Sequence, residues 1–198
     1  MDSLPIRRAI LSVTDKSGLV DLARFLVDGG VELVSTGGTK KVIAEAGLPV
    51  AAVSDVTGFP EILGGRVKTL HPHIHAGILV DKDQDEHIRT LEELGIAPFD
   101  LIVVNLYNFA LAAERGLDLK AAVEEIDIGG PTMLRAAAKN FHSVLVAPEP
   151  GVYLRIMQEL GDNEYCAGLE LRREMAAATF SATSRYDAMI TEYMASRT

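Results

Sequence analysis

Two short segments combine hydroxyl side chains, glycines and a lysine in a way that suits a single phosphate group. They are Ser12-Val13-Thr14-Asp15-Lys16 and Ser35-Thr36-Gly37-Gly38-Thr39. Glycines let backbone N–H groups approach an anion closely, hydroxyls donate hydrogen bonds, and the lysine adds positive charge. Either segment alone would read as a turn with a helix cap, but two of them after successive strands favour a phosphate site. The spacing is neither a Walker loop nor the dinucleotide fingerprint, so ATP and NAD are not implied.

A third segment, residues 64–72, holds two cations and a hydroxyl in a loop bounded by glycines and a proline. On its own it reads as a solvated basic loop. It leads into histidines at positions 71, 73 and 75, which alternate and could line one face of a strand. No carboxylate or cysteine accompanies them at ligand spacing, so we expect no metal site. Pro72 disfavours a helical conformation for His71.

Polar residues also follow a predicted strand and open a predicted helix further along the chain. Asn105-Leu106-Tyr107 ends a strand, and residues 125–131 lead into a helix that ends near Lys139. Tyr107 could equally be a core aromatic, Asp127 a helix cap, and Lys139 a cation that complements a helix C-terminus. The spacing alone leaves these alternatives open.

The elements that would position these groups alternate between strands and amphipathic helices, which is typical of a parallel sheet in an α/β fold. We expect strands at residues 9–13, 32–35, 50–53, 101–105 and 143–147. We expect helices at residues 18–28, 40–46, 84–94, 119–125, 131–139 and 169–194, with Thr39 capping the second. In an open parallel sheet, ligands bind beyond the carboxyl ends of the strands, where the two phosphate segments would lie.

Two regions depart from this alternation. Residues 55–76 are rich in glycine and proline, and we expect an ordered, irregular excursion at the sheet edge, which in compact domains is often functional. Everything beyond Glu149 reads as helical. The last helix carries a stripe that includes Met175, Tyr186 and Tyr193, which we interpret as a packing surface against the sheet or a partner subunit.

The overall composition limits the classes of partner. The chain has 198 residues and a net charge of −9, so a nonspecific grip on nucleic acid is excluded. The single Cys166 rules out an internal disulfide and fits a reducing compartment. No stretch approaches the roughly 20 apolar residues that span a bilayer, and residues 1–8 lack the apolar run of a signal peptide behind them. We therefore expect a cytoplasmic protein without nucleic-acid or membrane partners.

Five motifs in order resemble those of IMP cyclohydrolase, the amino-terminal domain of the bifunctional purine-biosynthesis protein. They are SVTDKSG, STGGT, TGFPEILGGRVKTLHPHIHAGIL, VVNLY and EIDIGGPTMLRAAAKN, and the likeness covers essentially the whole chain. The resemblance implies the methylglyoxal-synthase-like (MGS-like) fold, a doubly wound α/β sandwich with a mainly parallel sheet plus C-terminal helices, and a homodimer. We expect one domain over residues 1–198, with residues 149–198 as a helical appendage. An AICAR transformylase domain would normally follow and is absent here, so we expect either an excised domain or a stand-alone enzyme.

The resemblance further implies an activity and the residues that carry it. The family closes the pyrimidine ring of inosine monophosphate from 5-formamidoimidazole-4-carboxamide ribonucleotide with loss of water, the last step of de novo purine biosynthesis, without cofactor or metal. By similarity, the catalytic residues are Lys68, Lys139, Tyr107 and Asp127. Those that bind the substrate would be Ser12, Thr14, Asp15, Lys16, Ser35, Thr36, Gly37, Gly38, Thr39, Arg66, Val67, Thr69, Val104, Asn105, Ile128 and Gly129.

Each catalytic residue takes a role from the resemblance. Lys68, with backbone amides near Asp127, would stabilise negative charge on the formyl oxygen. Lys139 would act as acid and base, with Tyr107 and Asp127 as relay and orienting groups. The sequence departs from the family pattern at Asn108, where a proline usually follows the tyrosine, and at Phe141, where His or Tyr often stands.

Two other functions remain open at this point. Methylglyoxal synthase shares the fold and the phosphate turn and acts on a triose phosphate, but gives no reason for residues 66–69 or 127–130. A nucleotide-sensing regulatory domain needs the phosphate turn but not Lys68, Tyr107 and Lys139 together. Turnover of the formamido ribonucleotide would separate the three.

Overall fold

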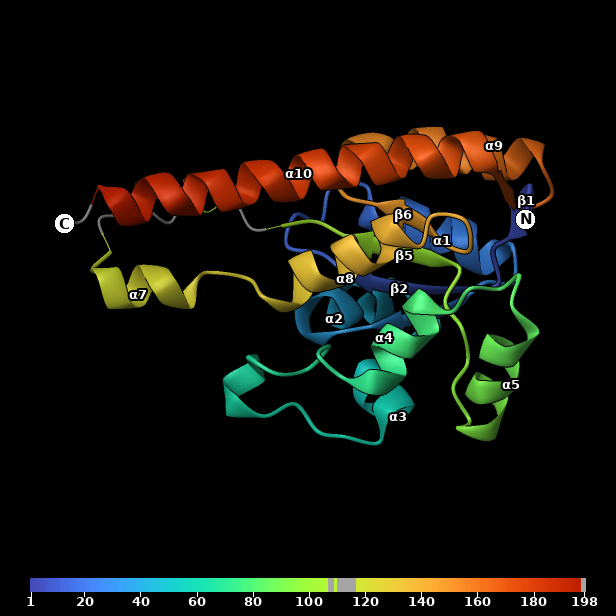
Figure 1. The fold of residues 1–198 in the computed structure, drawn as a ribbon, viewed down its shortest axis with the longest axis horizontal. Coiled ribbons are helices and arrows are strands. Elements are labelled where there is room, and N and C mark those ends of the chain that lie inside the picture. Colours follow the sequence, from blue (N-terminus) through green and yellow to red (C-terminus); the bar gives the residue numbers. More distant parts are fainter. Residues whose placement is uncertain (107–108, 110–116, 197–198) are drawn as a thin grey trace.

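A five-stranded parallel sheet runs through the centre of the molecule (Figure 1). The computed structural model describes residues 1–106, 109 and 117–196. In the sheet the strand order is β4-β3-β2-β5-β6. The strands are β2 (Arg8–Ser12), β3 (Glu32–Ser35), β4 (Ala51–Ala52), β5 (Leu101–Val104) and β6 (Leu145–Ala147). The expected strands are thus confirmed, each within three residues of its predicted ends.

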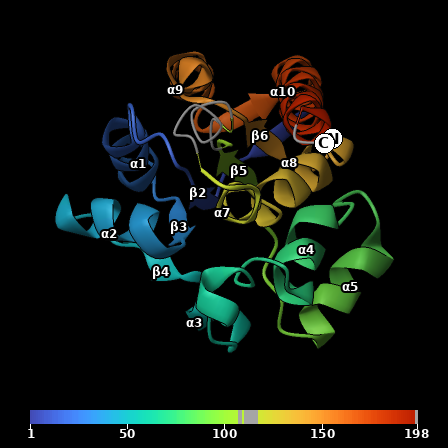
Figure 2. The same ribbon diagram turned by 90° about the vertical axis from the view of Figure 1, so that its left-hand side faces the viewer.

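Helices cover both faces of the sheet. Figure 2 shows α1 and α9 on one side and α4 and α8 on the other. The helices are α1 (Leu19–Asp28), α2 (Gly37–Glu45), α3 (Val53–Thr57), α4 (Pro72–Leu79), α5 (Asp85–Glu93), α7 (Leu119–Glu124), α8 (Gly129–Lys139), α9 (Tyr153–Asp162) and α10 (Leu169–Ala195). Single 3₁₀ turns span Leu63–Gly65 and Pro150–Val152. The predicted doubly wound α/β sandwich is confirmed.

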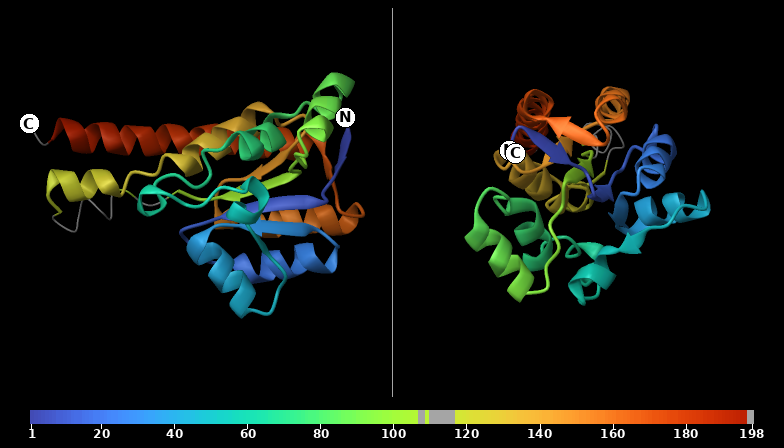
Figure 3. Two further views of the ribbon diagram at one scale, coloured as in Figure 1. Left: turned by 90° about the horizontal axis from the view of Figure 1, so that it is seen from below. Right: turned by 90° about the vertical axis from the view of Figure 1, so that its right-hand side faces the viewer.

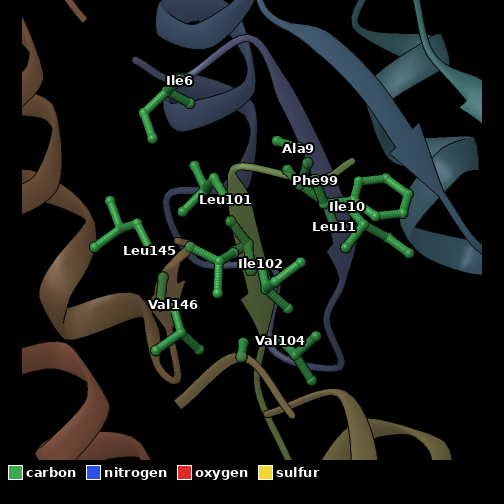
Figure 4. Close-up of a cluster of buried hydrophobic side chains, with 14 of the residues drawn as sticks. Ile6, Ala9, Ile10, Leu11, Phe99, Leu101, Ile102, Val104, Leu145 and Val146 are labelled. Carbon is green, nitrogen blue, oxygen red and sulfur yellow. The ribbon is translucent and has the colours of Figure 1, made fainter. Parts of the chain in front are cut away.

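The central strands are apolar on both faces because helices bury both faces. All four residues of β5 are buried, and its neighbour β2 places Ile10 beside Ile102 in the register. Figure 4 shows the side chains of Ile10 and Ile102 together with those of Leu145 and Val146 from β6. Continuous apolar runs of this kind are expected of parallel strands in a two-sided sandwich.

Two of the sequence predictions for the helices are wrong. The second helix starts at Gly37 rather than Lys40, so its N-cap is Thr36 and not Thr39. Residues 55–76 also contain more helix than expected, because α4 begins at Pro72. Proline fits the first helical turn, where its missing N–H would have no intrahelical partner. His71 is extended, as predicted, and caps this helix by accepting from the His73 N–H at 3.2 Å.

The prediction that the segment beyond Glu149 is wholly helical is wrong. Cys166–Gly168 forms β7, which pairs antiparallel with β1 (Ser3–Pro5), and the right-hand view of Figure 3 shows the two strands side by side. Strands of three residues are too short to show an alternating pattern in the sequence. Helix α10 also contributes Leu171 and Met175 to the main core, so this segment packs as part of the domain.

Helix α10 spans 27 residues and extends past the sheet, where α7 lies beneath its far end (Figure 1). Its predicted packing stripe is confirmed in part, because Met175, Tyr186 and Tyr193 are buried. In the part of the chain that the structure describes, no helix combines the length and apolar character needed to cross a membrane.

A buried arginine joins the start of the chain to the core. Arg172 has no exposed surface, and its guanidinium donates hydrogen bonds to five backbone carbonyls. The acceptors are the carbonyls of Met1 (2.7 Å), Phe141 (3.1 Å), Asp2 (3.2 Å), Gly168 (3.3 Å) and His142. This one side chain therefore links the start of the chain, the β7 segment and the turn before β6.

We expect Arg172→Met to lower the free energy of unfolding by about 3 kcal/mol, because buried carbonyls would lose their donors. The matched control is Arg173→Met, which removes the same charge from the adjacent, exposed position and should change the free energy by no more than about 0.5 kcal/mol. Urea denaturation of both variants is the measurement. Equal midpoints for the two variants would contradict this role for Arg172.

Candidate active site

A cavity of about 700 Å³ opens beyond the carboxyl ends of β2, β3 and β5. It lies where the strand order reverses, since β3 and β5 flank β2 on opposite sides. Open α/β sheets bind ligands at this point, and the volume is typical of a small-molecule site. The lining residues are Ser12, Val13, Thr14, Lys16, Thr36, Gly37, Gly38, Thr39, Gly64, Gly65, Arg66, Lys68, Thr69, Asn105, Val123, Glu124, Glu125, Ile126, Asp127, Ile128, Gly129, Gly130 and Met133.

The two predicted phosphate segments lie side by side and are tied together by their own hydroxyls. Ser12 Oγ and Thr36 Oγ1 are 2.8 Å apart. Thr39 Oγ1 accepts from the Val13 N–H at 3.0 Å and donates to the Val13 carbonyl at 2.9 Å. Ser35 Oγ donates to a carbonyl of β2 at 2.7 Å. These hydroxyls form hydrogen bonds within the protein and hold the loops in place.

Donors available to an anion include the backbone N–H groups at the start of α2 and the amino group of Lys16, which also donates to the Val13 carbonyl. Gly37 and Gly38 are exposed at the first turn of this nine-residue helix. First-turn N–H groups have no intrahelical acceptor, and the helix dipole favours negative charge there. Burial lowers the pKa of the Lys16 amino group, and the Asp15 carboxylate partly offsets this. The arrangement suits a phosphomonoester.

Asn105, directly after β5, fixes the first of these loops. Its Oδ1 accepts from the Thr14 N–H (2.7 Å), the Thr14 hydroxyl (2.8 Å) and the Asp15 N–H (3.0 Å), and its Nδ2 donates to the Asp15 carbonyl at 2.8 Å. The side chain is 5% exposed. Asn105 thus lines the cavity and also sets the position of the loop.

The loop before α4 forms a second wall. Lys68 is exposed, and its Nζ donates to the Gly65 carbonyl at 3.2 Å. The Arg66 guanidinium pairs with the Glu124 carboxylate at 3.3 Å and so joins this loop to the end of α7. Glu124 was not predicted to line the site, because an acidic residue on a short helix carries no local signal of a ligand.

The start of α8 closes the cavity and depends on two glycines. Asp127 Oδ1 accepts from the Gly130 N–H at 3.0 Å, and a Cβ on Gly130 would lie 2.1 Å from Asp127 Oδ2. A Cβ on Gly129 would lie 2.5 Å from Thr69 Oγ1. Side chains larger than hydrogen would therefore push apart the groups that meet here. The backbone amides at this helix start lie against the same cavity as Lys68.

Most predicted site residues meet in this one cavity, and a few do not. Asp15, Ser35, Val67 and Val104 lie outside the lining, although each is a chain neighbour of a residue within it. The fourteen that line it are Ser12, Thr14, Lys16, Thr36, Gly37, Gly38, Thr39, Arg66, Lys68, Thr69, Asn105, Asp127, Ile128 and Gly129.

Two of the four predicted catalytic residues are not found in this lining. Tyr107 lies outside the described residues. Lys139 is exposed at the other end of α8, an 11-residue helix, about 15 Å along its axis from Gly129. Within the described residues, no group of three or more His, Cys, Asp or Glu side chains is placed to hold a metal ion.

Two protein-family models match the chain. A model described as an MGS-like domain matches residues 18–132. This range includes every lining residue of the cavity except Ser12, Val13, Thr14, Lys16 and Met133. A model described as the AICARFT/IMPCHase bienzyme matches residues 137–198. The two matches are separated by residues 133–136, which lie within α8.

Several curated proteins, named bifunctional purine biosynthesis protein PurH, are similar over nearly the whole chain. That of Mesorhizobium japonicum is 51% identical over 98% of this chain and 36% of its own length. That of Rhodospirillum rubrum is 50% identical over 98% and 37%. That of Halalkalibacterium halodurans is 52% identical over 95% and 37%. The chain therefore spans little more than a third of these relatives.

A solved structure matches the fold from end to end. The crystal structure of ForH superposes with a TM-score of 0.86 and 33% sequence identity, over 96% of this chain and 97% of that one.

We expect Asn105→Ala to weaken the binding of a phosphomonoester in this cavity at least about ten-fold, because the loop that carries Lys16 would lose four hydrogen bonds. Asn140→Ala is the matched control. This variant loses two hydrogen bonds of 2.8 Å that the Asn140 amide donates to the Ile78 and Val80 carbonyls, at the far end of α8. Titration calorimetry measures both, and an unchanged dissociation constant for Asn105→Ala would count against this positioning role.

Proposed function

The chain belongs to the family of MGS-like domains, and we propose that it converts 5-formamidoimidazole-4-carboxamide ribonucleotide into inosine monophosphate with loss of water. The observation that carries the proposal is one cavity that joins an anion site at α2 to a lysine and a helix start at its other wall. A ribonucleotide has a phosphate at one end and the reacting ring at the other, and these two sites suit the two ends. The names of the relatives support the same reading.

The phosphate end positions the substrate. The α2 amides and the Lys16 amino group bind the phosphate, and Asn105 keeps the Lys16 loop in register with β5. Fixing one end of the ribonucleotide leaves the base directed across the cavity. Well-oriented intramolecular attack can lower the activation barrier by roughly 7 to 11 kcal/mol.

The ring end supports the charge that develops on ring closure. The carboxamide nitrogen attacks the formyl carbon, a C–N bond forms, and the formyl oxygen becomes negative. This oxygen then takes protons and leaves as water, while protons leave the two nitrogens. Lys68 and the amides at the start of α8 are the groups that stabilise the oxyanion, and the Asp127 carboxylate orients that helix start. The reaction changes no oxidation state, so it calls for no redox cofactor.

Ring closure also needs proton transfer from the two nitrogens to the departing oxygen. The resemblance assigns it to Lys139, with Tyr107 as relay. The position of Lys139 at the far end of α8 gives this assignment no support from the described geometry. The proposal also includes a homodimer in the cytoplasm and, in a longer protein, an AICAR transformylase domain after this one.

The two rival functions make different predictions for one assay. A spectroscopic assay with the formamido ribonucleotide should show turnover to inosine monophosphate by the 198-residue chain. A methylglyoxal synthase would instead consume dihydroxyacetone phosphate, and a nucleotide sensor would bind without turnover. The absence of turnover would overturn the proposal.

We expect Lys68→Met to lower kcat by about 10²- to 10³-fold with a much smaller change in KM, because the oxyanion would lose its cation. Lys41→Met is the control: Lys41 is exposed on α2 and pairs with Glu45 at 3.8 Å, so its loss should leave both constants near wild type. A kcat of wild-type size in Lys68→Met would exclude Lys68 from the chemistry.

Lys139→Ala tests whether Lys139 has the acid/base role that the resemblance implies, although it lies outside the cavity lining. Because Lys139 lies about 15 Å from Gly129, we expect a near wild-type rate and an unchanged pH profile. The measurement is kcat/KM across the pH range. Loss of the basic limb of that profile would instead support the acid/base role that the resemblance implies.

A further inference from the structure

One side chain of the C-terminal helix reaches the wall of the cavity. Tyr186 on α10 is 2% exposed and packs in a cluster with Phe109, Ala122 and Tyr193. A phenylalanine would fill such an apolar position equally well. A buried tyrosine hydroxyl needs a polar partner, and the identity of that partner is informative.

The partner of this hydroxyl is Asp127. The Asp127 N–H donates to Tyr186 Oη at 2.8 Å, across 59 positions of sequence. The Asp127 carboxylate in turn caps α8 through the Gly130 N–H. The backbone of Asp127 is thus held from behind by α10, while its side chain holds the first turn of α8. Burial raises the pKa of Tyr186, so its hydroxyl is neutral at physiological pH.

The same helix start forms the ring end of the cavity. Asp127, Ile128 and Gly129 all line it, as does Lys68. A shift of this backbone would move the amides that face the reacting oxygen without disturbing the phosphate site, which is built from β2, β3 and β5. Misplacement by about 1 Å can cost a catalyst up to about a hundred-fold in rate.

We propose that Tyr186 is a positioning residue that sets the place of Asp127 and the start of α8 at the ring end of the active site. This inference rests on the proposed function and deepens it. The MGS-like match ends at residue 132, whereas Tyr186 lies in the segment matched by the bienzyme model. The C-terminal helix therefore adds a support to the site from outside the MGS-like segment.

The test is Tyr186→Phe, which removes the hydroxyl and keeps the ring in its cluster. We expect kcat to fall about ten-fold, the size of one hydrogen bond, with KM changed less than about three-fold. Tyr165→Phe is the matched control, because its hydroxyl donates one hydrogen bond of 3.0 Å to the Phe25 carbonyl, remote from the cavity. That variant should lose similar stability and keep wild-type kcat.

A second readout does not depend on turnover. Hydrogen exchange should show faster exchange at the Asp127 amide in Tyr186→Phe than in wild type, and no change there in Tyr165→Phe. Equal effects of the two variants on kcat, or unchanged exchange at Asp127, would overturn the positioning role. If the wild-type chain shows no turnover, the proposed function fails, and the exchange experiment alone still decides whether Tyr186 positions Asp127.

Discussion

The cavity depends on one buried amide. Asn105 bonds through both ends of its amide to the loop after β2, and the Ser12 hydroxyl at the end of β2 bonds to Thr36 after β3. The ends of β2, β3 and β5 are thereby joined into one wall of the cavity without a ligand. Since the binding of a phosphate need not order these loops, less of the interaction free energy is lost as conformational entropy. An aliphatic side chain of similar size would take this acceptor away from the Thr14 and Asp15 N–H groups.

The acidic character of the chain and its affinity for an anion are compatible, because they act over different distances. The net charge of −9 repels extended polyanions. Within the cavity, by contrast, Lys16, Arg66 and Lys68 converge with the amides of a helix start. Arg66 is already paired with Glu124, so part of this positive charge is balanced locally. The site therefore favours a small anion that can enter fully over a long one that would also meet the acidic surface.

The sequence predicted the parts of the fold that leave a periodic or compositional mark. The apolar run of β5 and the two phosphate segments are of this kind, and their place at the strand ends follows from parallel topology. It did not predict that Ser35 and Thr39 bond inward, since a hydroxyl has the same local signature in either role. The β1–β7 pair and the bond between Tyr186 and Asp127 join distant positions, and no local pattern reports such contacts.

The two ends of the cavity are held by different kinds of structure. Adjacent strands and their loops build the phosphate end, and these strands belong to the main hydrophobic core. The ring end is held where three separate elements meet: Thr69 lies against Gly129, Asp127 caps Gly130, and Tyr186 comes from α10 beyond the sheet. Elements with fewer core contacts open at lower free energy than central strands. Partial loosening of the domain should therefore release the ring end first, so that the ability to bind a phosphorylated ligand outlasts the ability to close its ring.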